Sequence, residues 1–357
     1  MAEQSLASRW IRRVFVYAPR RLLKNIAETL RLIAFALLRP AASFLPRSWA
    51  LALADLVGAI VAASTAGRSA RLGMELSFGQ SADPARLARG WLTRPFTDYV
   101  IFRRILTGRE GTGRWRIEHR GLEKCQVLFE PGQSVIVATG HFARHPIIAL
   151  YFPEIIPKKL AAVVAALDHR SKDPTSLRLR LQFGQMMDVL KYVRHGDIEL
   201  VEVGIPGAAS RLLQSLQEPG NVVVMAVDPP WPTERPGSFE RAFAGHLSQG
   251  YATGAARLSR LAQCPVVTCI PYLEDDGRII FEWSEPIPPA RPEDRGSDVR
   301  VTNRILDSIE RAVGLRPTQY VLKIGHHRRW DPTSESWRPV EASPGRAGAS
   351  DLVDTSP

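Results

Sequence analysis

Cysteine is scarce in this sequence, which contains three cysteines in 357 residues: Cys125, Cys264 and Cys269. Their spacing matches no zinc site, and three cysteines cannot build the disulfide framework of a small secreted domain. We therefore expect free cysteines in a protein core and a reducing compartment. No metal site and no bound cofactor are indicated.

Long apolar runs are also absent. A spanning helix needs about 20 predominantly apolar residues, but "LIAFALL" (32–38) stops at Arg39-Pro40 and "WALALADLVGAIVAAS" (49–64) contains Asp55. No small-residue cleavage site follows an uninterrupted apolar core, so no secretory signal is expected. We interpret the N-terminal region as lying on one membrane surface, with a single span at residues 26–45 as the alternative.

Acidic residues are nearly missing from the first 50 positions. Nine basic residues there face only Glu3 and Glu28, a local net charge of +7 within a chain total of +11. The basic residues alternate with large apolar ones such as Trp10, Phe15 and Leu22. This mixture is typical of amphipathic helices on an anionic membrane. Nucleic-acid binding is the competing interpretation, but no DNA- or RNA-binding motif supports it, so no nucleic-acid partner is expected.

The rest of the chain predicts an α/β fold. Residues 18–65 look helical with breaks near Pro40 and Pro46, and a helix is expected over 84–106. Further on, β-rich runs are expected at 115–120, 134–139, 160–167, 188–193, 221–227, 264–273 and 278–287, with helices at 174–185, 206–218, 252–263 and 297–313. This alternation predicts a mostly parallel central sheet flanked by helices. The expected domains are membrane-associated helices (1–65), the α/β domain (66–330) and a disordered polar tail (331–357).

Two of the predicted strands end in polar residues. "SVIVATGH" delivers His141, and "NVVVMAVD" delivers Asp228. Because ligands of parallel sheets bind at the carboxyl ends of the strands, these two residues are candidates for a catalytic site.

Five blocks of sequence, in order from about Leu45 to Trp330, resemble one family. They are "LPRSWALALADLVGAIV", "RWRIEHRGLEKCQVLFEPGQSVIVATGHF", "DPTSLRLRLQFG", the stretch from "VVVMAVDPPWPTERPG" to "CPVVTCIPYLEDDGR", and "RPTQYVLKIGHHRRW". Together they resemble the bacterial lipid A biosynthesis acyltransferases, the lauroyl/myristoyl transferases of the lysophospholipid acyltransferase superfamily. The resemblance implies transfer of a fatty acyl chain from an acyl carrier protein or coenzyme A thioester to a membrane lipid. It also implies a peripheral or singly anchored enzyme on the cytoplasmic face of the inner membrane.

The resemblance implies a His-x4-Asp/Glu motif that supplies a general base and its orienting carboxylate. Counted from His141, however, the acidic position falls on Pro146. Three interpretations follow. Asp228, or less simply Asp168, reaches His141 from elsewhere in the chain. Alternatively, His145 or a water network orients His141. In the third interpretation the site has lost acyl transfer, and the protein binds lipid or supports a biosynthetic assembly.

The same resemblance suggests the remaining site residues. Arg180 and Gly184 fall on the family's Arg-x-x-Phe-Gly block and are candidates for holding an oxyanion or the donor. Arg235, Arg241 and Gly245 lie in the loop after Asp228, where a phosphate-rich head group could bind. The acceptor, the acyl length and the choice between the two donors stay open.

Overall fold

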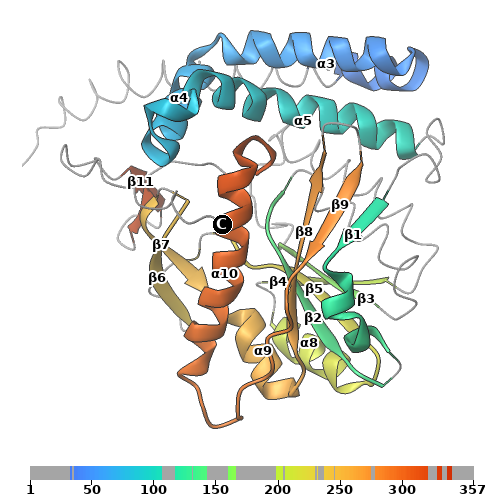
Figure 1. Ribbon diagram of the computed structural model, residues 1–357, viewed down its shortest axis with the longest axis vertical. Helices are drawn as coiled ribbons and strands as arrows, with labels where there is room; N and C mark the ends of the chain where they lie inside the picture. The colour runs from blue at the N-terminus through green and yellow to red at the C-terminus, as the bar shows by residue number, and fades with distance from the viewer. Residues whose placement is uncertain are drawn as a thin grey trace, which may run out of the picture.

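The structure is a computed structural model that describes residues 33, 36–106, 117–130, 132–142, 160–165, 198–203, 206–229, 231, 237–244, 246–274, 278–320, 328–331 and 336–339. The helices α3, α4 and α5 lie together across one end of the molecule (Figure 1). The helices α8 and α9 lie at the other end, and α10 runs between the two groups beside the central sheet.

The central sheet has seven strands in the order β1-β9-β8-β2-β5-β3-β4. Its strands are β1 (Ile117–Arg120), β2 (Val135–Thr139), β3 (Leu160–Ala165), β4 (Ile198–Val203), β5 (Val222–Ala226), β8 (Val266–Leu273) and β9 (Ile279–Trp283). The five strands from β8 to β4 are mutually parallel, and β9 runs antiparallel to β8. The prediction of an α/β fold with a mostly parallel sheet is therefore confirmed.

The central strands β2, β5 and β8 are buried on both faces, which explains why they are apolar runs instead of alternating with charged residues. Successive side chains of β2 belong to different cores: Ile136 and Ala138 face one cluster, and Val135 and Val137 face the other. Cys269 of β8 lies in the second cluster, and all three cysteines are buried and free, as expected.

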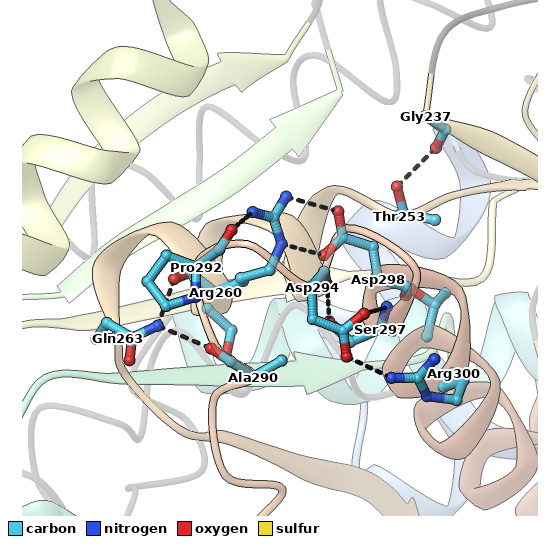
Figure 2. Close-up of polar contacts among 12 residues, drawn as sticks. Gly237, Thr253, Arg260, Gln263, Ala290, Pro292, Asp294, Ser297, Asp298 and Arg300 are labelled. Carbon is cyan, nitrogen blue, oxygen red and sulfur yellow. Dashed lines mark hydrogen bonds and ion pairs between the residues drawn. The ribbon is translucent and has the colours of Figure 1, made fainter.

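Three helices cover the face of the sheet to which Ile136 and Ala138 point: α8 (Ala208–Gln217), α9 (Gly254–Ala262) and α10 (Ser297–Leu315). Each buries an apolar stripe, which in α10 includes Ile305 and Ile309. The joint between α9 and α10 is polar, because the Arg260 guanidinium forms a two-pronged ion pair with Asp298, at 2.8 and 3.0 Å (Figure 2).

A second layer consists of α3 (Arg47–Ala62), α4 (Thr65–Phe78) and α5 (Pro84–Leu106). Helix α3 packs on α5 through small residues, Ala50, Ala54 and Gly58, which recur every fourth position on its buried side. A Cβ atom at Gly58 would lie 2.4 Å from the Thr93 hydroxyl oxygen, so the glycine allows the two helices to approach closely. None of the described helices combines the length and apolar character that crossing a bilayer requires.

The structure corrects several local predictions. Residues 36–44 form one helical run through Pro40, so the break expected there is wrong, whereas the break at Pro46 is present. The antiparallel pairing of β10 (Arg328–Asp331) with β11 (Ser336–Pro339) shows that the predicted tail is not disordered at 336–339. The strand β4 and the hairpin of β6 (Ser238–Phe243) and β7 (His246–Ala252) were not predicted. The expected elements at 174–185 and 188–193, and residues 1–32, lie outside the described residues.

Candidate functional site

The candidate site lies where the neighbouring parallel strands β2 and β5 end. In their register Thr139 faces Ala226, so each strand continues two residues further to a polar side chain, His141 after β2 and Asp228 after β5. The main-chain N–H of Val227 donates to the Thr139 carbonyl oxygen at 3.0 Å, which extends the pairing beyond the last strand residues. The strand register alone therefore brings His141 and Asp228 together.

Both oxygens of the Asp228 carboxylate contact His141. Oδ1 lies 2.6 Å from the imidazole Nδ1, and Oδ2 accepts a hydrogen bond of 2.7 Å from the main-chain N–H of the same residue. This double contact fixes the ring relative to its own backbone, and it leaves Nε2 as the ring nitrogen that faces away from the carboxylate.

Burial of the two partners differs. The Asp228 side chain is fully covered, whereas 23% of the His141 side chain is exposed. A buried carboxylate beside a partly exposed imidazole is the arrangement of a general base with its orienting group.

The two groups shift each other's pKa in opposite directions. Burial disfavours the charged imidazolium, but the charge of Asp228 and its hydrogen bond outweigh burial and raise the pKa of His141 above its ordinary value. Burial likewise disfavours the Asp228 carboxylate, but its contacts with His141 and Tyr320 outweigh that cost and lower its pKa.

Gly140 makes the close approach of these elements possible. A Cβ atom at this position would lie 2.8 Å from Ile309 Cγ2 of α10 and 3.3 Å from Asp228 Oδ2. Any larger residue would push α10 or the carboxylate away, so the glycine of "TGH" belongs to the geometry of the site.

Two buried tyrosines that the sequence analysis did not single out lie in this region. Tyr320 is 3% exposed and its hydroxyl lies within hydrogen-bonding reach of Asp228. Tyr251 of β7 is fully buried, and its hydroxyl has no partner among the described residues. Tyr320 lies in "RPTQY", part of the last block quoted for the resemblance, which was the one sequence signal that pointed to it.

Arg241 binds α10. Its guanidinium contacts Asp307 at 2.8 Å and Glu310 at 2.5 Å, and a second Glu310 oxygen accepts the main-chain N–H of Ala244 at 2.8 Å. These contacts attach the β6–β7 hairpin to α10. Because two carboxylates already neutralise this guanidinium, it offers a phosphate little net attraction; the predicted phosphate-binding role is not tested.

The other predicted site residues, His145, Arg180, Gly184, Arg235 and Gly245, lie outside the described residues, as does Asp168. Within the part of the chain that the structure describes, no three His, Cys, Asp or Glu side chains gather closely enough to hold a metal ion.

Comparisons with known proteins identify the family. A family model described as bacterial lipid A biosynthesis acyltransferase matches residues 21–331. Among solved structures, the chain is similar to the 1-acyl-sn-glycerophosphate (LPA) acyltransferase PlsC from Thermotoga maritima. That similarity has 13% identity and a TM-score of 0.31, and it covers 73% of this chain and 97% of the other. No curated protein sequence matches the chain.

Proposed function

Since the chain belongs to the family of bacterial lipid A biosynthesis acyltransferases, we propose that it transfers a fatty acyl chain to a lipid acceptor with His141 as the general base. The acyl donor is an acyl carrier protein or coenzyme A thioester, and the acceptor is a hydroxyl or amine of a membrane lipid or glycolipid. The observation that supports this most directly is the contact of both Asp228 oxygens with His141. That contact supplies the carboxylate which Pro146 cannot.

In the proposed mechanism, Asp228 holds the Nδ1 proton of His141, so that Nε2 is the basic nitrogen. Nε2 takes the proton of the acceptor hydroxyl as the hydroxyl oxygen attacks the thioester carbonyl carbon. The tetrahedral intermediate then collapses, the carbon–sulfur bond breaks, and the imidazolium returns the proton to the departing thiolate. Asp228 stays ionised throughout and stabilises the imidazolium.

The proposed location is the cytoplasmic face of the inner membrane. Helix α3 supports a surface location because its outward side carries Trp49, Leu56 and Ile60, which are 69%, 57% and 64% exposed. They recur at intervals of seven and four residues and so form one stripe along the helix. An apolar stripe with Arg47 at its end suits an anionic lipid surface.

The test is mass spectrometry of membrane lipids from cells with and without the gene, complemented by wild type, His141→Ala or Asp228→Asn. We expect one acylated species to vanish without the gene and to return only with wild type. That species would also name the acceptor. Unchanged lipids, or full complementation by His141→Ala, would overturn the proposal and favour a homologue that binds lipid without transferring acyl groups.

A further inference from the structure

Tyr320 occupies a fixed place behind the candidate catalytic pair. Its backbone pairs with that of Phe142, the residue after His141, in an isolated antiparallel bridge. Its ring meets the Phe142 ring edge-on, with centroids 5.6 Å apart, and lies 6.2 Å from the ring of Phe243. The side chain is therefore attached to the same short segment that carries the proposed base.

The hydroxyl of this tyrosine faces the carboxylate. It lies within hydrogen-bonding reach of Asp228, whose two oxygens already contact the main chain and the ring of His141. A carboxylate with donors on several sides has little rotational freedom. We propose that Tyr320 is a positioning residue of the acyl-transfer site, holding Asp228 in the orientation that in turn orients His141; the inference rests on the function proposed above.

The segment that carries Tyr320 is itself anchored on two sides. The Trp91 indole N–H of α5 donates to the Tyr320 carbonyl oxygen at 2.7 Å. The amide of Gln319 forms two hydrogen bonds with the main chain of Leu273, at the end of β8, at 2.8 and 2.7 Å. The tyrosine is thus fixed between the helical layer and the sheet, as a positioning residue must be.

Tyr251 provides a matched comparison in the same environment. It is a second buried tyrosine near Asp228, and its ring contacts Phe243, which also contacts Tyr320. Its hydroxyl, however, has no partner within the described part of the chain. Removing each hydroxyl should therefore separate the effect of donation to Asp228 from the effect of losing a buried polar atom.

Among the residues that the structure describes, few charged groups lie around the pair. The groups near it are Tyr320, Tyr251 of β7, Arg241 of β6 and Glu310 of α10. Arg241 is paired with both Glu310 and Asp307, and these charges are the same in all the variants compared below. A hydroxyl that donates toward the pair places its positive end there, which disfavours the imidazolium. Loss of the Tyr320 hydroxyl should therefore raise the pKa of His141.

The test compares Tyr320→Phe with Tyr251→Phe in the full-length protein. For Tyr320→Phe we expect kcat to fall about tenfold or more, because a hydrogen bond to a charged group is lost. The acid limb of the kcat/KM profile should move to higher pH. Tyr251→Phe should change kcat less than about twofold and leave that limb unmoved. The inference is overturned if the two variants behave alike.

A measurement that does not depend on catalysis tests the role of Tyr320 independently of the proposed function. NMR titration of the His141 ring should show a higher pKa in Tyr320→Phe and no change in Tyr251→Phe, whether or not acyl transfer is detected. If Tyr320→Phe is too unstable for titration, 3-fluorotyrosine at position 320 keeps the shape and strengthens the donor, so the pKa of His141 should fall. An unmoved pKa would refute the positioning role, whereas wild-type activity in His141→Ala would refute the proposed function instead.

Discussion

At the scale of single residues, His141 contacts a carboxylate that follows the neighbouring strand β5. A His-x4-Asp/Glu motif places base and carboxylate on one local segment, but here the carboxylate comes from residue 228, 87 positions away in the chain. In the proposed mechanism this exchange preserves the chemistry, because a catalytic imidazole needs an anionic acceptor on Nδ1, whatever its origin in the sequence.

The variant Asp228→Asn tests whether Asp228 is the carboxylate that orients His141. The amide cannot stabilise an imidazolium and favours the wrong tautomer, so we expect kcat to fall by about a thousandfold or more, as in the protease precedent. Steady-state assays with acyl thioester and lipid acceptor measure the loss. Asp55→Asn, an exposed aspartate of α3, is the control and should keep full activity. A mild loss in Asp228→Asn would mean that another group orients His141.

The pH dependence of activity follows from the raised pKa of His141. A base works only when unprotonated, so kcat/KM should rise with pH through a value above the ordinary 6.5 of histidine. Replacing Asp228 by Asn removes the main stabilisation of the imidazolium. In that variant the residual activity should therefore rise at a lower pH. If kcat/KM rises at the same pH in wild type and in Asp228→Asn, the rise reports the titration of a group other than His141.

Stability should depend on pH through the same pair. Because the folded pKa of His141 is raised, its contribution to stability is present below the unfolded pKa of about 6.5 and is lost as pH rises through the folded pKa. Because the folded pKa of Asp228 is lowered, its contribution is present above about 3.8 and is lost as pH falls. The difference in melting temperature between wild type and Asp228→Asn should thus be largest between these limits. A difference that does not vary with pH would contradict the coupling.

The residues of the site were only partly predictable. His141 and Asp228 stood out because each follows an apolar strand, and strand ends of a parallel sheet share one edge. That β2 and β5 are neighbours depends on the strand order, which the spacing of residues does not encode, so Asp168 remained a candidate beside Asp228. Tyr320 escaped notice because a tyrosine after a short turn has no local pattern that separates a core residue from a positioning one.

At the scale of elements, strands buried on both faces were easiest to predict. The apolar runs of β2, β5 and β8 have no competing helical period and were located to within two residues. The hairpin β6–β7 was missed because its strands lie off the central sheet and carry mixed side chains such as Glu240 and Arg241. Its turn also depends on Ala244 with φ of 47°, a conformation that the residue type does not suggest.

The joint between α9 and α10 offers a stability test at this scale. The Arg260–Asp298 pair has side chains only 6% and 11% exposed, and Arg260 also donates to the Pro292 carbonyl oxygen. Arg260→Gln leaves a covered carboxylate without its partner, so we expect the free energy of unfolding to fall by about 2 kcal/mol. Denaturant titration followed by circular dichroism measures this loss.

The matched control is an ion pair in the same region (Figure 2). The pair Arg300–Asp294 has side chains 67% and 44% exposed, so water competes with it. Arg300→Gln should cost less than about 1 kcal/mol. Equal losses in the two variants would mean that burial does not distinguish these ion pairs.

At the scale of the whole molecule, the helical layer has two different sides. Its inner side packs small residues of α3 against α5, and Trp91 of α5 reaches Tyr320 behind the site. Its outer side exposes Trp49, Leu56 and Ile60. The layer therefore joins an apolar outer surface to the segment that contacts the proposed catalytic pair.

Binding to lipid vesicles tests the outer surface. We expect the full-length protein to bind phosphatidylglycerol vesicles more tightly than phosphatidylcholine vesicles, and the difference to shrink with salt, because the N-terminal region is basic. Trp49→Ser with Leu56→Ser should weaken binding at least tenfold, since burying one large apolar side chain contributes about 1.5–3 kcal/mol.

The control for this surface is Leu261→Ser. Leu261 is 45% exposed but belongs to α9, at the far end of the molecule from α3 (Figure 1). Its replacement should leave vesicle binding unchanged, while all variants keep the wild-type melting temperature. If the α3 variant binds vesicles as wild type does, the basic residues before position 33 alone hold the protein on the membrane. Deletion of residues 1–32 should then abolish binding, whereas a membrane-facing α3 predicts that part of it survives.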